Sequence, residues 1–128
     1  MTRAAAFAAY RGKRILVVER DVLVPFALYR AIERFGAEIV GPVAFVDDVT
    51  LLTRDLHFDG AIIDSRIPDI GRSSIEILLR RLDVPFVEAC RSMRCTSGQH
   101  GCYRLIDAEK DLAVMAEALF SRCPSQCT

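Results

Sequence analysis

One stretch of the chain limits its fold more than any other: the apolar run at residues 60–63, which ends in Asp64. A short apolar run between turn residues is typical of a buried strand. The run at residues 15–18 ends in the same way, in the acids Glu19 and Asp21. Because functional groups of an open parallel sheet gather at the carboxyl ends of its strands, we expect these acids to share one pocket. Such a pocket suits a divalent cation and a phosphoryl group.

Apolar runs of strand length alternate with segments of helical period along the chain. This alternation indicates a doubly wound α/β domain, with helices on both faces of a parallel sheet. The strands are expected at residues 14–18, 38–43, 60–63, 84–89 and 102–106. The helices are expected near residues 21–35, 47–56, 73–82 and 107–122, with Ser73 or Ser74 capping the third. Gly41-Pro42 places the second strand near an edge of the sheet.

The length and composition fit one domain, expected at residues 13–122 between a flexible N-terminal tail (1–12) and a C-terminal tail (123–128). The 17 basic and 17 acidic residues cancel, which argues against sequence-independent binding of nucleic acid. No apolar run approaches the ~20 residues that cross a bilayer, so we expect no membrane association. The five cysteines are an odd set without a secretory signal, which favours reduced thiols and a cytoplasmic location.

Five motifs occur in order along the chain. They are Ile-Leu-Val-Val-Glu19-Arg20-Asp21, Gly36-Ala37-Glu38-Ile39-Val40-Gly41-Pro42, Asp59-Gly60-Ala61-Ile62-Ile63-Asp64, Ile67-Pro68-Asp69 and Val84-Pro85-Phe86-Val87. Through them, residues 14–122 resemble a response-regulator receiver domain, and the last motif resembles the subgroup whose fourth strand reads PFxFATGY. The resemblance implies the flavodoxin-like receiver fold, with five parallel strands in the order 2-1-3-4-5.

The resemblance also implies a role in two-component or phosphorelay signalling. Asp64 would be the phosphoacceptor, taking a phosphoryl group from a histidine kinase or phosphotransfer protein. The resemblance further implies Mg²⁺ held by the neighbouring acids, with a Thr or Ser ending the fourth strand and a Lys ending the fifth to bind phosphoryl oxygens. We expect a single-domain protein that acts by protein contact rather than as an enzyme. Receivers often dimerise through the faces around their fourth and fifth helices, so the resemblance leaves a homodimer open, although this region of the chain departs from the pattern.

The sequence departs from the receiver pattern at several positions. Arg20 stands where the main magnesium-binding aspartate belongs, and Cys90 fills the Thr or Ser position. The lysine position falls on or near Leu105, with Arg104 beside it. The segment between the fourth and fifth strands is short, so the fourth helix is expected to be reduced or absent. Tyr103 is either the aromatic that some receivers rotate on activation or an ordinary strand residue.

Arg20 leaves two alternatives open. A guanidinium beside Asp64 and Glu19 would supply positive charge in place of the metal, which puts the Mg²⁺ cofactor in doubt. Alternatively, Arg20 points to solvent and leaves Glu19 and Asp21 to bind a weaker metal.

Two main functional hypotheses follow, with a third more distant. In the first, Asp64 accepts a phosphoryl group as a relay intermediate or phosphate sink. In the second, the phosphorylation switch is degenerate and the domain binds a partner constitutively. The third is a thiol-based metal or redox sensor, because Cys90, Cys95, His100 and Cys102 supply soft ligands, although their spacing matches no standard zinc motif.

Overall fold

A five-stranded parallel sheet forms the centre of the computed structural model, which describes residues 2–20, 24, 26–90, 102–107 and 109–120. The strands are β1 (Arg14–Val18), β2 (Glu38–Val43), β3 (Gly60–Asp64), β4 (Phe86–Cys90) and β5 (Cys102–Arg104). They pair in the order β2-β1-β3-β4-β5, which confirms the predicted doubly wound sheet and its strand order. β2, which contains Gly41-Pro42, lies at one edge as predicted.

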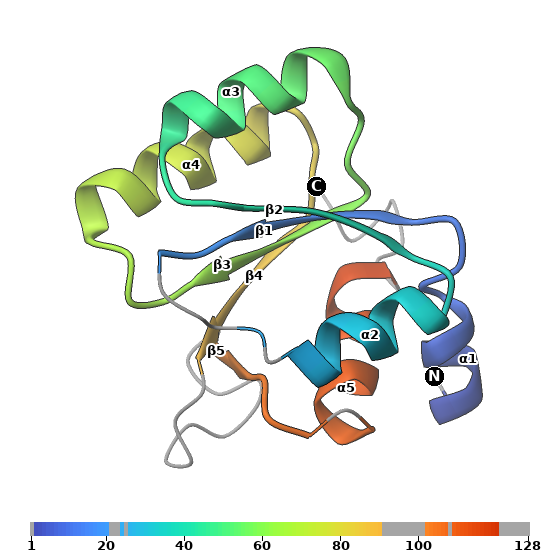
Figure 1. Cartoon of the computed structure of the whole chain (residues 1–128). Helices are drawn as coiled ribbons and strands as arrows, with labels where there is room; N and C mark the ends of the chain where they lie inside the picture. The colour runs from blue at the N-terminus through green and yellow to red at the C-terminus, as the bar shows by residue number, and fades with distance from the viewer. Residues whose placement is uncertain (1, 21–23, 25, 91–101, 108, 121–128) are drawn as a thin grey trace.

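Helices cover both faces of this sheet (Figure 1). The described helices are α1 (Arg3–Ala8), α2 (Phe26–Arg34), α3 (Val46–Asp55), α4 (Asp69–Arg81) and α5 (Lys110–Phe120). Helices α1, α2 and α5 pack on one face, and α3 and α4 pack on the other. The predicted reduction of the fourth receiver helix concerns residues 91–101, which lie outside the described residues, as does the predicted C-terminal tail.

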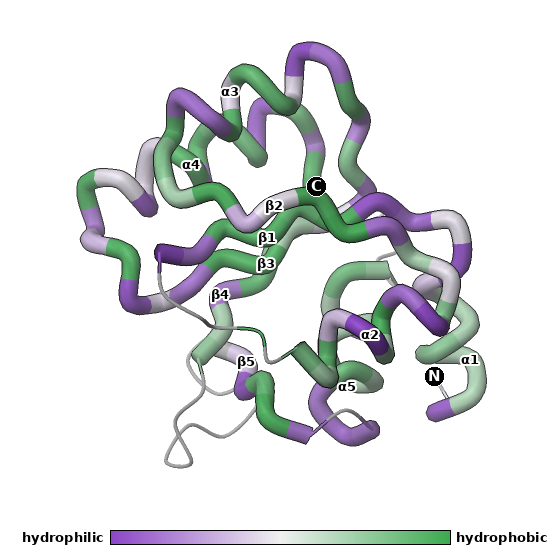
Figure 2. Tube along the Cα trace, viewed as in Figure 1, coloured by the Kyte–Doolittle hydropathy of each residue, from purple (hydrophilic) through white to green (hydrophobic). Residues whose placement is uncertain are grey.

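Side chains alternate along β1 between the two faces of the sheet. Ile15 and Val17 join the core shared with α2 and α5, whereas Leu16 and Val18 join the core shared with α3 and α4. All four are fully buried. Full burial of an aliphatic side chain of this size stabilises the folded state by about 1.5–3 kcal/mol. Figure 2 shows hydrophobic residues concentrated along the central strands, whereas the helices on both faces mix hydrophobic and hydrophilic residues. This double cover holds the carboxyl ends of β1 and β3 in fixed positions.

Helix α4 begins earlier than the sequence pattern predicted. Its first residue is Asp69 and its N-cap is Pro68, whereas the cap was expected at Ser73 or Ser74. The fixed φ of proline, here −55°, suits the entry to a helix, and Asp69 complements the positive end of the helix dipole. Ser74 lies inside the helix, where its hydroxyl donates to the Ile70 carbonyl at 3.2 Å. The helix therefore starts directly at the loop that follows β3.

The N-terminal segment is packed on the domain, so the prediction of a flexible tail over residues 1–12 is wrong for its described part. Helix α1 places the Phe7 ring on the Phe35 ring, with centroids 4.4 Å apart. Tyr10 is fully buried, and its hydroxyl donates to the Leu112 carbonyl of α5 at 2.6 Å. These contacts join residues far apart in the sequence, and the alanine-rich composition of the segment does not reveal them.

Tyr10→Phe is expected to lower the free energy of unfolding by about 1 kcal/mol, because it removes one buried hydrogen bond and keeps the ring. Urea unfolding measures the difference. Tyr103→Phe is the matched control, since among the described residues the Tyr103 hydroxyl has no hydrogen-bond partner. Equal effects of the two substitutions would contradict the described anchoring of the N-terminal segment.

Candidate functional site

The ends of neighbouring strands bring the predicted site residues to one edge of the sheet. β1 and β3 pair in parallel register, so Glu19, just after β1, lies level with Asp64 at the end of β3. Asp64 is opposite Ala89 of β4, and Cys90 ends that strand. Both acids are buried, with Glu19 8% and Asp64 1% exposed. The two carboxylates therefore share one edge, as the strand pattern predicted.

Arg66, which the sequence analysis did not single out, holds the Asp64 carboxylate. Its Nε lies 3.0 Å from Oδ1 and 3.1 Å from Oδ2, and its Nη2 donates to Oδ2 at 2.9 Å. The Arg66 backbone N–H also donates to Oδ1 at 2.9 Å. Charge-assisted contacts of this bidentate kind are among the stronger hydrogen bonds in proteins. The Arg66 side chain is 54% exposed, so the guanidinium covers a buried carboxylate from the solvent side.

A tight turn brings Arg66 back over Asp64. The Ile67 N–H donates to the Asp64 carbonyl at 3.1 Å, while the Arg66 N–H donates to the Asp64 side chain as in an Asx-turn. An aspartate that ends a strand and begins such a turn places the residue two positions later beside its own carboxylate. That local rule is the signal in the sequence that could have identified Arg66.

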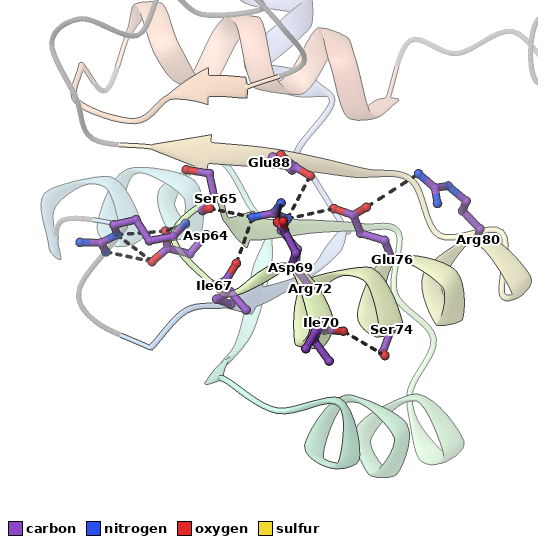
Figure 3. Close-up of polar contacts among 11 residues, drawn as sticks. Asp64, Ser65, Ile67, Asp69, Ile70, Arg72, Ser74, Glu76, Arg80 and Glu88 are labelled. Carbon is purple, nitrogen blue, oxygen red and sulfur yellow. Dashed lines mark hydrogen bonds and ion pairs between the residues drawn. The ribbon is translucent and has the colours of Figure 1, made fainter.

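Arg72 of α4 fixes the same turn from its other side (Figure 3). Its Nη1 donates to the carbonyls of Ser65 at 2.8 Å and Ile67 at 3.0 Å. Its Nη2 pairs with the Asp69 carboxylate. The loop that carries Arg66 is thus tied to α4 at two points, one on each side of Arg66.

Glu19 is turned toward the start of α2. Its Oε2 accepts from the Val24 N–H at 3.1 Å, and its Oε1 accepts from the Tyr29 hydroxyl at 3.2 Å. Burial, together with the charge of Glu19 and this hydrogen bond, raises the pKa of Tyr29 above its ordinary value. The phenol therefore stays a proton donor to Glu19 at neutral pH. Tyr29 is a further site residue that the sequence analysis did not identify.

The described residues do not fit Mg²⁺ in this arrangement. Mg²⁺ needs carboxylate oxygens free to coordinate it in near-ideal octahedral geometry. Both oxygens of Asp64 accept from Arg66, and both oxygens of Glu19 accept from groups of α2 or the segment before it. No group of three His, Cys, Asp or Glu side chains that could hold a metal occurs within the described part of the chain. Asp21, the remaining predicted acid, lies outside that part.

Arg20 is exposed at the end of β1. Among the described residues, no carboxylate forms an ion pair with it. Arg20 is thus directed to solvent as in the second alternative, but Glu19, which that alternative left to a weaker metal, accepts from Val24 and Tyr29 instead. The guanidinium at Asp64 comes instead from Arg66.

A buried apolar side chain fills the position that the resemblance assigns to a lysine. Leu105 is fully buried in the core shared with α2 and α5, and it offers no charge to a phosphoryl group. Arg104 has its Nε 3.5 Å from Oδ1 of the buried Asp111 on α5. Asp111 also accepts from the N–H groups of Ile106 at 2.8 Å and Asp107 at 2.7 Å. This cluster holds the turn between β5 and α5.

The remaining predicted site residues are only partly described. Cys90 is half-buried, and Tyr103 is half-buried against the core shared with α2 and α5. For the thiol hypothesis, Cys95 and His100 lie outside the described residues, as does the side chain of Cys102. The structure thus brings together Asp64 and Glu19 with Arg66 and Tyr29 as their partners.

No family model and no curated protein matches the sequence. Several solved structures resemble the chain, among them two response regulators. The response regulator PhyR from Brucella abortus has a TM-score of 0.66 and 17% identity, over 91% of this chain and 52% of that one. The PhyR stress response regulator has a TM-score of 0.70 and 16% identity, over 95% of this chain and 50% of that one. The chain therefore spans about half the length of these two structures.

Among the described helices, none is long and apolar enough to cross a membrane. The strand order, the acidic edge and the likeness to both PhyR structures lead to one conclusion. The chain has the fold of a response-regulator receiver domain.

Proposed function

We propose that the protein is a signalling module of the response-regulator kind that works by protein–protein contact, without phosphorylation of Asp64. One observation carries the proposal. The Asp64 carboxylate, which would have to attack a phosphoryl donor, already accepts from Arg66 at both of its oxygens.

Phosphoryl transfer depends mainly on positioning and on neutralising the charge of the transferred group. In this protein the Arg66 side chain donates to both oxygens of Asp64, so whichever oxygen would attack is already hydrogen-bonded. Leu105 supplies no positive charge at the lysine position, and the thiol of Cys90 is a weak hydrogen-bond donor. The acceptor is therefore covered, and two of the groups that would stabilise the product are lacking.

The edge of the sheet around Asp64 offers apolar area for a protein contact. Phe26, Phe45 and Ile70 stand near the starts of the three helices that follow β1, β2 and β3, and they are 75%, 65% and 89% exposed. They stand at the carboxyl end of the sheet, the end that carries Asp64, and exposed large apolar side chains are candidates for contact with another protein. We propose a histidine kinase or phosphotransfer protein as the partner, in the cytoplasm.

A second candidate function is the phosphoacceptor role of Asp64. It is favoured by the exposure of Arg66, because a side chain that is 54% exposed can swing into solvent, where water replaces its hydrogen bonds. Departure of this side chain would uncover a buried carboxylate at the end of β3, beside Glu19.

Intact-mass measurement after incubation with a small phosphodonor and Mg²⁺ separates the two. Under the main proposal, wild type and Asp64→Asn remain equally unmodified, also when a histidine kinase replaces the small donor. One added phosphoryl group on wild type and none on Asp64→Asn would replace the main proposal by the second candidate.

A further inference from the structure

A cluster of charged side chains joins α4 to β4 beside residues 65–68 (Figure 3). These residues connect β3 to α4 and are called the Asp64 loop here. Arg72 lies at its centre, with Nε 3.5 Å from Oε1 of Glu88 on β4 and 3.8 Å from Oε2 of Glu76 on α4. Arg80 contributes a second cation, 3.9 Å from Oε1 of Glu76. The same Arg72 guanidinium binds the Asp64 loop through its other nitrogens. The cluster therefore connects β4 to the turn that carries Arg66.

The cluster contains three carboxyl groups but only two cations, Arg72 and Arg80. Glu76, Glu88 and Asp69 all lie within ion-pair distance of Arg72, and Glu76 is 14% exposed. Among the described residues, the buried Oε2 of Glu76 has no hydrogen-bond partner. A buried oxygen of this kind is costly unless it is paired. A proton placed between Glu76 and Glu88 would satisfy it and would remove one negative charge.

We propose that Glu76 keeps a proton near neutral pH and donates it in a hydrogen bond to Glu88, and that loss of this proton loosens α4 from β4 and with it the Arg72 anchor of the Asp64 loop. The proposal is independent of whether Asp64 is phosphorylated. It makes the position of this loop sensitive to pH.

The groups that face Glu76 account for the direction of the effect. Burial, the hydrogen bond that a protonated Glu76 can donate to Glu88, and the charge of Glu88 raise the pKa of Glu76 from 4.5 to about 7, against the opposing charges of Arg80 and Arg72. Arg80 is also shared with the Phe86 ring of β4, 5.2 Å from its centroid. Asp69, the third carboxylate in contact with Arg72, pairs with Nη2 of that guanidinium.

The sign of the pH dependence follows from linkage. Between pH 4.5 and about 7 the folded chain keeps a proton on Glu76 that the unfolded chain has lost. The contribution of this group to stability therefore falls as pH rises through that window. Above it the contribution stays at its lower value.

Glu76→Gln tests the proposal, because glutamine keeps the size of the side chain, carries no charge and can donate to Glu88. Its folding constant relative to wild type is expected to rise on the order of tenfold from about pH 5.5 to about pH 8, measured by urea unfolding. Glu33→Gln, on the exposed face of α2, is the matched control and should show no such rise. A ratio that stays constant or falls with pH would overturn the proposal, since ionised Glu76 would then be stabilised by its arginines.

Two further measurements make the test independent of how well one variant folds. Glu88→Gln removes the other carboxylate of the pair, so its relative folding constant should rise with pH in the same way. In wild type, the Ile67 amide resonance should titrate with a midpoint near pH 7, and in Glu76→Gln it should not. An Ile67 resonance that is constant across this range in wild type would refute the link between the pair and the Asp64 loop.

Discussion

Arg66→Gln is expected to raise the affinity for Mg²⁺ at least about tenfold over wild type, a change equivalent to about 1.4 kcal/mol. The substitution frees the Oδ atoms of Asp64 from the guanidinium that now covers them. It also removes a positive charge from the position where a divalent cation would approach, and charges about 4 Å apart near a protein surface interact by several kcal/mol. A ligand that binds only the folded state raises its stability, so the rise in the urea midpoint with Mg²⁺ concentration measures the affinity.

Arg20→Gln is the matched control for this experiment. It removes the same charge from the same edge of the sheet, but Arg20 is exposed and forms no ion pair with any described carboxylate. The control should leave the affinity for Mg²⁺ within about twofold of wild type, because an exposed charge is largely screened by solvent. An equal gain in both variants would mean that general charge, and not the cover on Asp64, limits metal binding. No gain in either would show that Arg66 is not what keeps the metal out.

The Arg66→Gln protein also refines the test of phosphorylation. If it binds Mg²⁺ and remains unmodified by a small phosphodonor, the apolar Leu105 and the thiol of Cys90 are sufficient to prevent the reaction. If it becomes phosphorylated on Asp64, the guanidinium of Arg66 alone is what prevents phosphorylation of the wild-type protein.

The sheet and its acidic edge could be predicted because both depend on local patterns. Apolar runs of strand length define the parallel strands, and the rule that such strands end at one edge brings Glu19 and Asp64 together. The partners of these acids depend on the turn after β3 and on the packing of α2. Arg66 reaches Asp64 through a turn of two residues, and Tyr29 reaches Glu19 from a helix. Neither position follows from hydrophobic periodicity.

Packing between distant segments explains the other differences from the sequence-based expectations. The N-terminal segment is held by aromatic contacts of Phe7 with Phe35 and of Tyr10 with Phe120, so a short alanine-rich segment is ordered where its composition suggested a tail. Arg20 and Arg66 are both arginines near Asp64 in the fold, and only the backbone geometry shows which of them pairs with it. The positive charge that one of the two alternatives placed beside Asp64 is present, but it comes from Arg66 and not from Arg20.

Gly41→Ala is expected to lower the free energy of unfolding by about 3 kcal/mol or more. Gly41 has a φ of +118°, which side chains of L-residues rarely adopt. A Cβ at this position would lie 2.6 Å from the backbone carbonyl oxygen of Val17 and 3.3 Å from the backbone N of Val43. These are main-chain atoms of two paired strands, so relief requires β2 to move away from β1.

Such a movement would also affect the site, because the Val43 carbonyl accepts from the Glu19 N–H at 2.9 Å. Gly12→Ala is the matched control. Gly12 has a φ of +74°, but no atom lies within 4 Å of the position of an added Cβ. Gly12→Ala should lower the free energy of unfolding by about 1 kcal/mol, which is the cost of placing alanine at a positive φ without any steric clash. Urea unfolding of both variants isolates the steric term, and a Gly41→Ala protein no less stable than the Gly12→Ala protein would contradict the described contact between β2 and β1.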